Sequence, residues 1–193
     1  MRFLRRVIFK IYRELLLFRI VVGKRFWGID YVVRQLALCP RVIISDLLRR
    51  NGAIIGENVN FKDSIQIDNA AGDRDSTGSF SNLVIGDCCY IGKGVFFDLP
   101  AKVQIERECV ISAGVKLLTH QDCGDRLMQK YYPRQVKGIV IGEGTWIGAN
   151  ALILSGVRLG RCCVVGAGAV VTQSFPDYSV VVGVPARVVN SLK

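Results

Sequence analysis

Residues 141–171 read IGEGTWIGANALILSGVRLGRCCVVGAGAVV, and an aliphatic residue opens each group of six. These positions are Ile141, Ile147, Ile153, Leu159, Val165 and Val171. Strands repeat every two residues and helices about every 3.6, so neither accounts for a period of six. The stretch therefore predicts a series of short structural repeats that stack on one another.

The same period extends toward the N-terminus in two further tracts. One tract holds Ile55, Phe61, Ile67, Ile85, Ile91 and Phe97, and the next, displaced by two residues, holds Ile105, Ile111 and Leu117. Six-residue segments separated by turns predict a triangular coil in which every turn buries its aliphatic residues against its neighbours as parallel strands. Glycine often follows the first residue of a group, as at Gly86 and Gly148, and is expected there to let the chain turn without a Cβ penalty. The fifth residues are small or β-branched, and three of them, Cys89, Cys109 and Cys163, are interpreted as core filling rather than reactive thiols.

The C-terminal repeats IGEGTWIGANALILSGVRLGRCCVVGAGAVVTQSFPDYSVVVGVPARVV (141–189) resemble the hexapeptide-repeat acyltransferases. That resemblance implies an all-β solenoid, a left-handed parallel β-helix, and a homotrimer with active sites in the grooves between subunits. We therefore expect three parts in the chain. They are a short, basic, amphipathic helical segment over 1–51, the β-helix over 52–184 with an excursion loop over 119–138, and a C-terminal tail over 185–193.

The N-terminal segment carries most of the net charge of +10, because residues 1–50 hold 12 Lys and Arg against 3 Asp and Glu, a net of +9. Basic residues interrupt its apolar runs, so no run is long enough to span a membrane. A helix here would group Arg2, Arg6, Lys10 and Arg13 on one face, with Leu4, Ile8, Ile11, Leu15 and Phe18 largely opposite. Two interpretations stay open: peripheral contact with an anionic membrane through residues 1–27, with Phe26 and Trp27 as anchors, or packing on its own domain or a neighbouring subunit. No nucleic-acid-binding motif accompanies the charge, so nucleic acid is not an expected partner.

His120 is the only histidine and opens the second of two stretches that break the repeat. The first break is the polar stretch 68–82, and the second, THQDCGDRLMQKYYPRQVKG at 119–138, is expected to leave the coil as a loop. Acyl transfer from a thioester to an alcohol needs a base that titrates near neutral pH, which suits imidazole. The stretch VFFDLPAKVQIERECVISAGVKLLTHQD (95–122) is similar to the segment that leads to the catalytic histidine of sugar O-acetyltransferases, and this resemblance gives His120 the role of base.

Three carboxylates, Asp98, Asp122 and Asp125, are candidates to orient the imidazole or to bind substrate hydroxyls, although each is equally well explained as a solvated side chain. Tyr132, with its neighbours Tyr131 and Pro133, is a candidate wall for a sugar ring. No metal site is expected. The γ-class carbonic anhydrases share the solenoid but need three histidine ligands for zinc, and this chain has one histidine.

The donor implied by the resemblance is acetyl-CoA. Matched to the family residue by residue, Trp146 and Ala149 line the pantetheine groove, Ala167 and Thr172 contact CoA, and Arg187 meets its phosphates. Gln173 and Asn190 stand where the family often carries lysine and arginine, so phosphate binding rests on Arg187 or on other basic residues. Ordinary coil positions are the alternative for each of these residues.

The sequence thus predicts an acetyl-CoA-dependent O-acyltransferase, most simply an O-acetyltransferase, that modifies a sugar hydroxyl in cell-envelope polysaccharide biosynthesis. An asparagine that maltose and galactoside acetyltransferases carry is missing here, and the resemblance is closer to the acetyltransferases of exopolysaccharide and lipopolysaccharide gene clusters, including the colanic acid type. An N-acetyltransferase of an amino nucleotide sugar and a non-catalytic trimeric scaffold at a membrane are the alternatives. The seven cysteines fit no disulfide framework, which predicts a cytoplasmic protein, or one held peripherally on the inner membrane.

Overall fold

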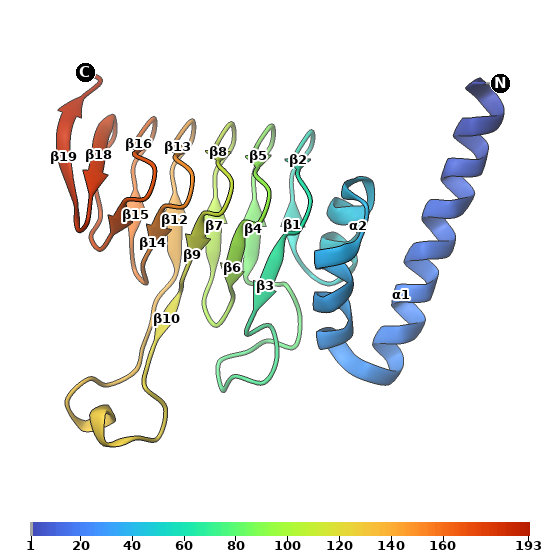
Figure 1. Ribbon diagram of the computed structural model, residues 1–193, viewed down its shortest axis with the longest axis horizontal. Coiled ribbons are helices and arrows are strands. Elements are labelled where there is room, and N and C mark those ends of the chain that lie inside the picture. Colours follow the sequence, from blue (N-terminus) through green and yellow to red (C-terminus); the bar gives the residue numbers. More distant parts are fainter. Residues whose placement is uncertain (1) are drawn as a thin grey trace.

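The computed structural model describes residues 2–193, with side chains from Val7 onward, so the faces expected for Arg2, Leu4 and Arg6 lie outside the described side chains. Helical elements precede a long coil of short strands (Figure 1). Helix α1 (Arg2–Leu38) is interrupted at Gly28, where φ is 68°. A 3-10 turn, η1 (Arg41–Ile43), then leads into α2 (Ile44–Arg50).

Most of the strands lie in three sheets whose strands are parallel within the coil, and each turn of the coil gives one strand to each sheet. The first sheet contains β1 (Ile54–Ile55), β4 (Leu83–Ile85), β7 (Val103–Ile105), β12 (Ile139–Ile141) and β15 (Arg158–Leu159). The second contains β2 (Asn60–Phe61), β5 (Tyr90–Ile91), β8 (Val110–Ile111), β13 (Trp146–Ile147), β16 (Val164–Val165), β18 (Ser179–Gly183) and β19 (Ala186–Ser191). The third contains β3 (Gln66–Asp68), β6 (Phe96–Asp98), β9 (Lys116–Leu117), β14 (Leu152–Ile153) and β17 (Val170–Val171). The parallel, three-sided arrangement matches the sequence prediction, and the hand of the coil stays a prediction.

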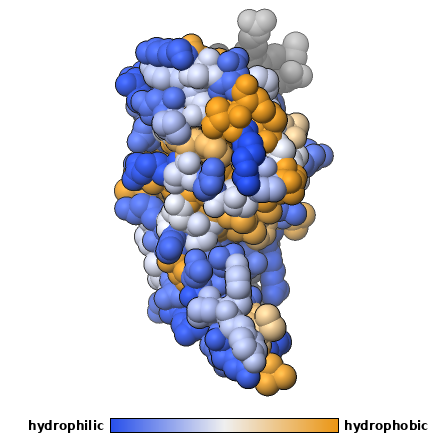
Figure 2. All heavy atoms as spheres, turned by 90° about the vertical axis from the view of Figure 1, so that its left-hand side faces the viewer, coloured by the Kyte–Doolittle hydropathy of each residue, from blue (hydrophilic) through white to orange (hydrophobic). Residues whose placement is uncertain are grey.

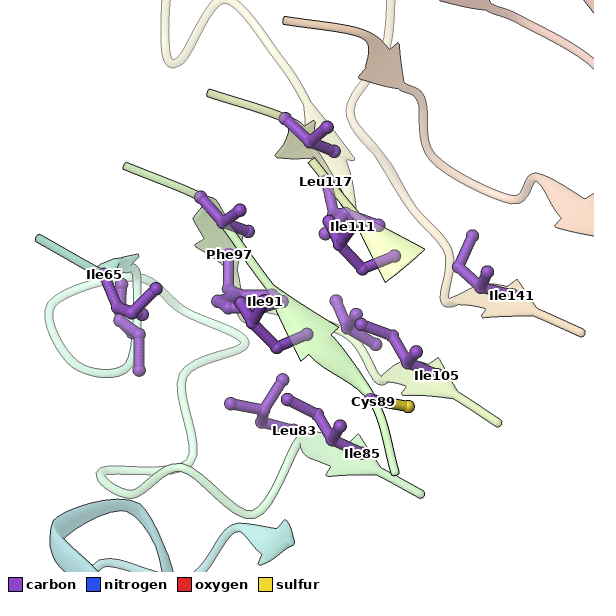
Figure 3. Packing of buried hydrophobic residues seen from close by; sticks show 14 of the residues in the cluster. Ile65, Leu83, Ile85, Cys89, Ile91, Phe97, Ile105, Ile111, Leu117 and Ile141 are labelled. Carbon is purple, nitrogen blue, oxygen red and sulfur yellow. The ribbon is translucent and has the colours of Figure 1, made fainter. Parts of the chain in front are cut away.

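The core of the coil consists of the residues that set the period of six. All fifteen periodic positions are buried, with at most 6% of any residue exposed. Figure 3 shows several of them, such as Ile91, Ile111 and Leu117, stacked from one turn to the next inside the coil. Cys89, Cys109 and Cys163 are also buried, as expected for small core residues. Because burying one such aliphatic side chain is worth about 1.5–3 kcal/mol, the stack supplies most of the driving force for coiling.

The expected role of the glycines that follow the periodic residues was wrong. Gly92 and Gly148 do not have positive φ; the chain instead turns two positions later, where residues such as Asn58, Gly94 and Glu108 adopt φ of 56°, 68° and 59°. A Cβ on Gly92 would lie 2.5 Å from the backbone nitrogen of Ala113 in the next turn of the coil. Glycine is therefore required because neighbouring turns approach closely, not because the chain turns there.

The helices cover the N-terminal end of the coil (Figure 1). Leu17 and Ile20 of α1 and Leu47 of α2 are buried and belong to the same apolar cluster as the core of the coil. Of the two interpretations of the basic segment, packing on its own domain is therefore observed for one face of α1. Within residues 2–193, no helix has an apolar stretch long enough to cross a lipid bilayer.

The opposite end of the coil is formed by the hairpin of β18 and β19, which are antiparallel to one another. The expected tail, 185–193, thus contains a strand. Figure 2 looks at this end of the molecule and shows apolar side chains on it, with a loop projecting from one side of the body. That loop begins and ends in a second antiparallel pair, β10 (His120–Gln121) and β11 (Gln135–Val136), and carries a short 3-10 turn, η2 (Leu127–Lys130).

Candidate active site

Three breaks in the repeat stack at one edge of the coil. The stretch 69–82 follows β3, the two-residue displacement at 99–102 follows β6, and the loop 119–138 follows β9. All three strands belong to the third sheet, where β6 pairs with both β3 and β9. We call this edge, between the third and the first sheet, the third corner. The polar residues of these three breaks, which come from successive turns of the coil, therefore lie one above another.

His120 and Asp98 meet at the third corner. Nδ1 of His120 lies 2.7 Å from Oδ2 of Asp98. The side chain of His120 is 23% exposed, whereas that of Asp98 is only 1% exposed. A carboxylate can only accept, so Nδ1 carries the proton in the neutral imidazole and Nε2 keeps its lone pair. The arrangement presents one basic nitrogen to a partly open site and fixes the ring from the buried side.

The carboxylate of Asp98 is held by several donors at once. The backbone N–H groups of Thr119 and His120 donate to Oδ2 over 2.8 and 3.1 Å. Nδ2 of Asn69 donates to Oδ1 over 2.7 Å. The Thr119 hydroxyl bridges the corner, because it donates to the Asp98 carbonyl over 3.0 Å and accepts from the N–H of Ala101 over 3.1 Å. Each break in the repeat thus contributes a group to the hydrogen-bond network around Asp98.

Asp122 and Asp125, the other two candidates for orienting His120, have different surroundings. Asp122 pairs with Arg134, which also binds Asp73 over 2.6 Å and Asp75 over 2.8 Å. The side chain of Arg134 is nearly buried. Its ion pairs join the loop 119–138 to the stretch 69–82. Its hydrogen bond and that from the N–H of Gly124 lower the pKa of Asp122.

Asp125 is exposed and lies farther out on the loop, beside an open hollow of about 870 Å³ that His120 does not line. Tyr132 is also exposed, on the same loop. Among the described residues, neither Asp122 nor Asp125 has a hydrogen bond to the imidazole, so the structure brings only Asp98 of the three carboxylates against it.

The residues matched to CoA binding are spread over two sides of the coil. Trp146 is exposed on β13 of the second sheet, and its Nε1 donates to Oγ of Ser112 over 3.2 Å. Ala149 and Ala167 stack at the corner between the second and third sheets, where the N–H of Gly168 donates to the Ala149 carbonyl over 2.8 Å. Arg187, on β19, is exposed and also extends the second sheet. Thr172 alone lies on the side of His120, since it follows β17 of the third sheet.

Asn69, Thr119 and Arg134 contribute to the site but were not singled out from the sequence. The register could have located Asn69, because Asp68 pairs with Asp98 and the next residue must then lie beneath the corner that holds His120. Arg134 had no such signal. Its partners Asp73 and Asp75 lie about 60 residues away, in an irregular stretch with no repeat to align.

Comparison with known proteins identifies the repeats. Residues 138–173 match the family model of the bacterial transferase hexapeptide (six repeats), and residues 82–118 match the hexapeptide repeat of succinyl-transferase. The probable acetyltransferase Rv3034c of Mycobacterium tuberculosis is 51% identical over 51 residues, which are 26% of this chain and 17% of the relative. The tetrahydropyridine-2,6-dicarboxylate N-acetyltransferase of Staphylococcus aureus is 43% identical over 71 residues, 37% of this chain and 30% of the relative. The chain therefore spans less than a third of the length of these curated relatives.

Solved structures match over most of the chain. The hexapeptide-repeat-containing acetyltransferase VCA0836 of Vibrio cholerae, complexed with acetyl coenzyme A, is 25% identical with a TM-score of 0.71, and the match covers 85% of both chains. A maltose O-acetyltransferase of Clostridium difficile is 22% identical with a TM-score of 0.71, over 85% of this chain and 84% of the other. The two matched stretches, 82–118 and 138–173, are hexapeptide repeats of the kind that such acetyltransferases contain, as the sequence predicted.

Proposed function

We propose that this chain of bacterial-transferase hexapeptide repeats is an acetyltransferase that moves the acetyl group of acetyl-CoA to a sugar hydroxyl. The observation that carries the proposal is the contact of 2.7 Å between Nδ1 of His120 and the buried carboxylate of Asp98. This contact leaves Nε2 of His120 free to act as a base at the start of the loop. Acyl transfer to an alcohol requires such a base.

The reaction follows from that geometry. Nε2 of His120 takes the hydroxyl proton as the acceptor oxygen forms a bond to the thioester carbonyl carbon, and Asp98 stabilises the imidazolium that results. The C–S bond then breaks, and the proton passes from the imidazolium to the departing thiolate of CoA. The acceptor gains an acetyl ester, CoA leaves as a thiol, and the imidazole returns to its neutral form.

On this proposal, the binding of acetyl-CoA requires a second copy of the chain. Trp146, Ala149 and Arg187 belong to the second sheet or its corner, whereas His120 follows the third sheet. We infer that the acetyl-CoA groove lies between two copies in a homotrimer of left-handed coils, with Ala167 and Thr172 contributing its remaining contacts. The outward row of the second sheet supports an interface there, because from β5 to β18 its residues in register are apolar: Tyr90, Val110, Trp146, Val164 and Val180.

The acceptor is a sugar of cell-envelope polysaccharide biosynthesis on this proposal, and the reaction is cytoplasmic. Tyr132 and Asp125 are exposed on the loop that begins at His120, and an aromatic ring and a carboxylate suit the faces and hydroxyls of a sugar. Asp122 acts at a distance, by fixing the loop through Arg134.

Transfer to an amine is the second candidate function. It is favoured by the N-acetyltransferase of Staphylococcus aureus, which is 43% identical over the matched repeats. An amino sugar presented to Nε2 of His120 would use the same base, because its ammonium must also lose a proton before it attacks.

The test is release of CoA from acetyl-CoA with panels of nucleotide sugars, lipid-linked sugars and amino sugars. We compare the wild-type chain with His120→Ala and with Met128→Ala, a control on the exposed tip of the same loop. Turnover that is lost in His120→Ala and kept in Met128→Ala supports the proposal, and the acceptor that works decides between ester and amide formation. Equal turnover by His120→Ala and the wild type would refute it, and a wild-type chain that does not bind acetyl-CoA would favour the scaffold.

A further inference from the structure

Helix α1 carries an apolar stripe that is largely exposed. The stripe consists of Ile8, Ile11, Leu15, Phe18 and Val22, which are 57, 55, 63, 66 and 40% exposed. The spacing of three and four residues places all five on one face of the helix. Soluble proteins rarely expose a continuous apolar surface of this kind unless it binds something.

The stripe points away from the protein. Leu17 and Ile20, on the opposite face of α1, are buried in the core that α1 shares with α2 and the first turn of the coil. Figure 1 shows α1 lying across the end of the coil rather than along it. From Ile8 to Val22 the stripe extends about 21 Å at 1.5 Å per residue, so it is long enough to lie along a flat surface at this end of the molecule.

The net charge of α1 selects the surface. Residues 2–27 hold eight Lys and Arg and one acidic residue, Glu14, a net of +7. Within the described part of this helix, ion pairs engage Arg13, with Asp46 and Glu14, whereas Lys10, Lys24 and Arg25 have none. A second copy of α1 placed against the stripe would bring two helices of net charge +7 together. An anionic surface would instead neutralise these cations.

We propose that the stripe of α1 docks on an anionic lipid bilayer, with the five apolar side chains in the headgroup and acyl boundary and the exposed Arg19 and Arg25, which flank the stripe, at the phosphates. Phe26, four residues beyond Val22, continues the stripe and acts as an anchor. Trp27 lies about half a turn away from Phe18 around the helix and stacks on Tyr31 instead, with ring centroids 5.5 Å apart. This surface is independent of the acyl transfer proposed above.

The test is sedimentation of the full chain with vesicles of phosphatidylcholine alone or mixed with phosphatidylglycerol. We compare the wild type with the double variant Leu15→Ser/Phe18→Ser. The matched control is Leu127→Ser/Leu192→Ser, which removes two similarly exposed side chains, 85% and 53% exposed, far from α1. All four side chains are exposed, so each variant is expected to fold, which its thermal unfolding checks.

We expect the wild type to bind the anionic vesicles and to dissociate as salt is added. Leu15→Ser/Phe18→Ser should bind at least about tenfold more weakly, and the control should bind like the wild type, because burying Leu and Phe drives insertion. Equal binding to neutral vesicles, or no binding by the wild type, overturns the proposal. A lower oligomeric mass of Leu15→Ser/Phe18→Ser without lipid also overturns it, since the stripe would then be a contact between copies. The measurement needs no acceptor, so its failure is separate from failure of the acyl transfer.

Discussion

Asp98→Asn separates the charge of the buried carboxylate from its hydrogen bonds. The amide oxygen can occupy the position of Oδ2 and still accept from Nδ1 of His120 and from the backbone N–H groups of Thr119 and His120. The amide nitrogen then faces the side chain of Asn69, which can rotate to present its oxygen. The variant keeps its contacts and loses one charge, so its free energy of unfolding should fall by only about 1 kcal/mol.

The effect on catalysis should be much larger. His120 becomes an imidazolium in the transition state, and the contact of 2.7 Å places its ring against the carboxylate. With charge centres roughly 4 Å apart and an effective dielectric constant of about 20, the pair is worth about 4 kcal/mol. This attraction is absent while the imidazole is neutral, so kcat should fall about 10³-fold, with KM little changed.

The assay follows loss of the thioester absorbance of acetyl-CoA, because the exposed Cys88 would react with a thiol reagent. Asp63→Asn, at an exposed position of a neighbouring turn, is the control. His120 is the sole histidine, so its ¹⁵N resonances report without assignment whether the proton sits on Nδ1. A kcat within about threefold of the wild type, in a variant that melts normally, would refute the role given to the charge of Asp98.

Three further outcomes follow from the same structure. Gly92→Ala should lower the free energy of unfolding by more than about 2 kcal/mol, because its Cβ would lie 2.5 Å from the backbone of the next turn. Gly94 has a φ of 68° and open space around it, so Gly94→Ala should lower the free energy of unfolding by only about 1 kcal/mol. Chemical denaturation compares the two variants. Arg134 holds the pKa of Asp122 below its ordinary value of 3.8, so the stability that this pair gives is present above that pH and is lost as the pH falls through the lower folded value. Arg134→Met should expose the loop to limited proteolysis at neutral pH and make its cleavage less sensitive to acid. An unchanged cleavage profile would contradict the role given to Arg134 in holding the loop. Acetyl-CoA should raise the melting temperature of the wild type, by the equivalent of about 2.7 kcal/mol at a concentration of 100 Kd, and Trp146→Ala should reduce that rise; an equal rise in both would remove Trp146 from the donor site.

The regular part of the coil could be predicted from the sequence because its information is local. Each periodic position, from Ile55 to Val171, is buried against the equivalent residue one turn away, so a single spacing specifies register and core together. The mistake over glycine shows where that logic ends. Sequence spacing marks that Gly92 must be small, but only coordinates distinguish a turn from the close approach of Ala113.

The candidate site was less predictable because its partners are distant in sequence. His120 could be found as the only histidine, but Asp98 and Asp122 were equal candidates to orient it while only sequence distance was available. Asp122, two residues away, is drawn to Arg134, whereas Asp98, 22 residues away, contacts the ring. In a coil, residues one full turn apart are closer in space than residues two apart on a loop that leads away from the body.

The phase of each break explains why the polar residues meet. The stretch 69–82, the displacement at 99–102 and the loop 119–138 differ in length, yet each begins just after a strand of the third sheet, so all three leave from the third corner. An irregular segment placed at any other corner would have interrupted the core without approaching His120. Because β3, β6 and β9 stay in register beneath the breaks, Asn69 and Asp98 are carried to the level of the imidazole by the buried aliphatic residues of the coil. The hydrophobic repeat therefore does more than stabilise the chain. It also positions the base and its carboxylate close enough to form a hydrogen bond.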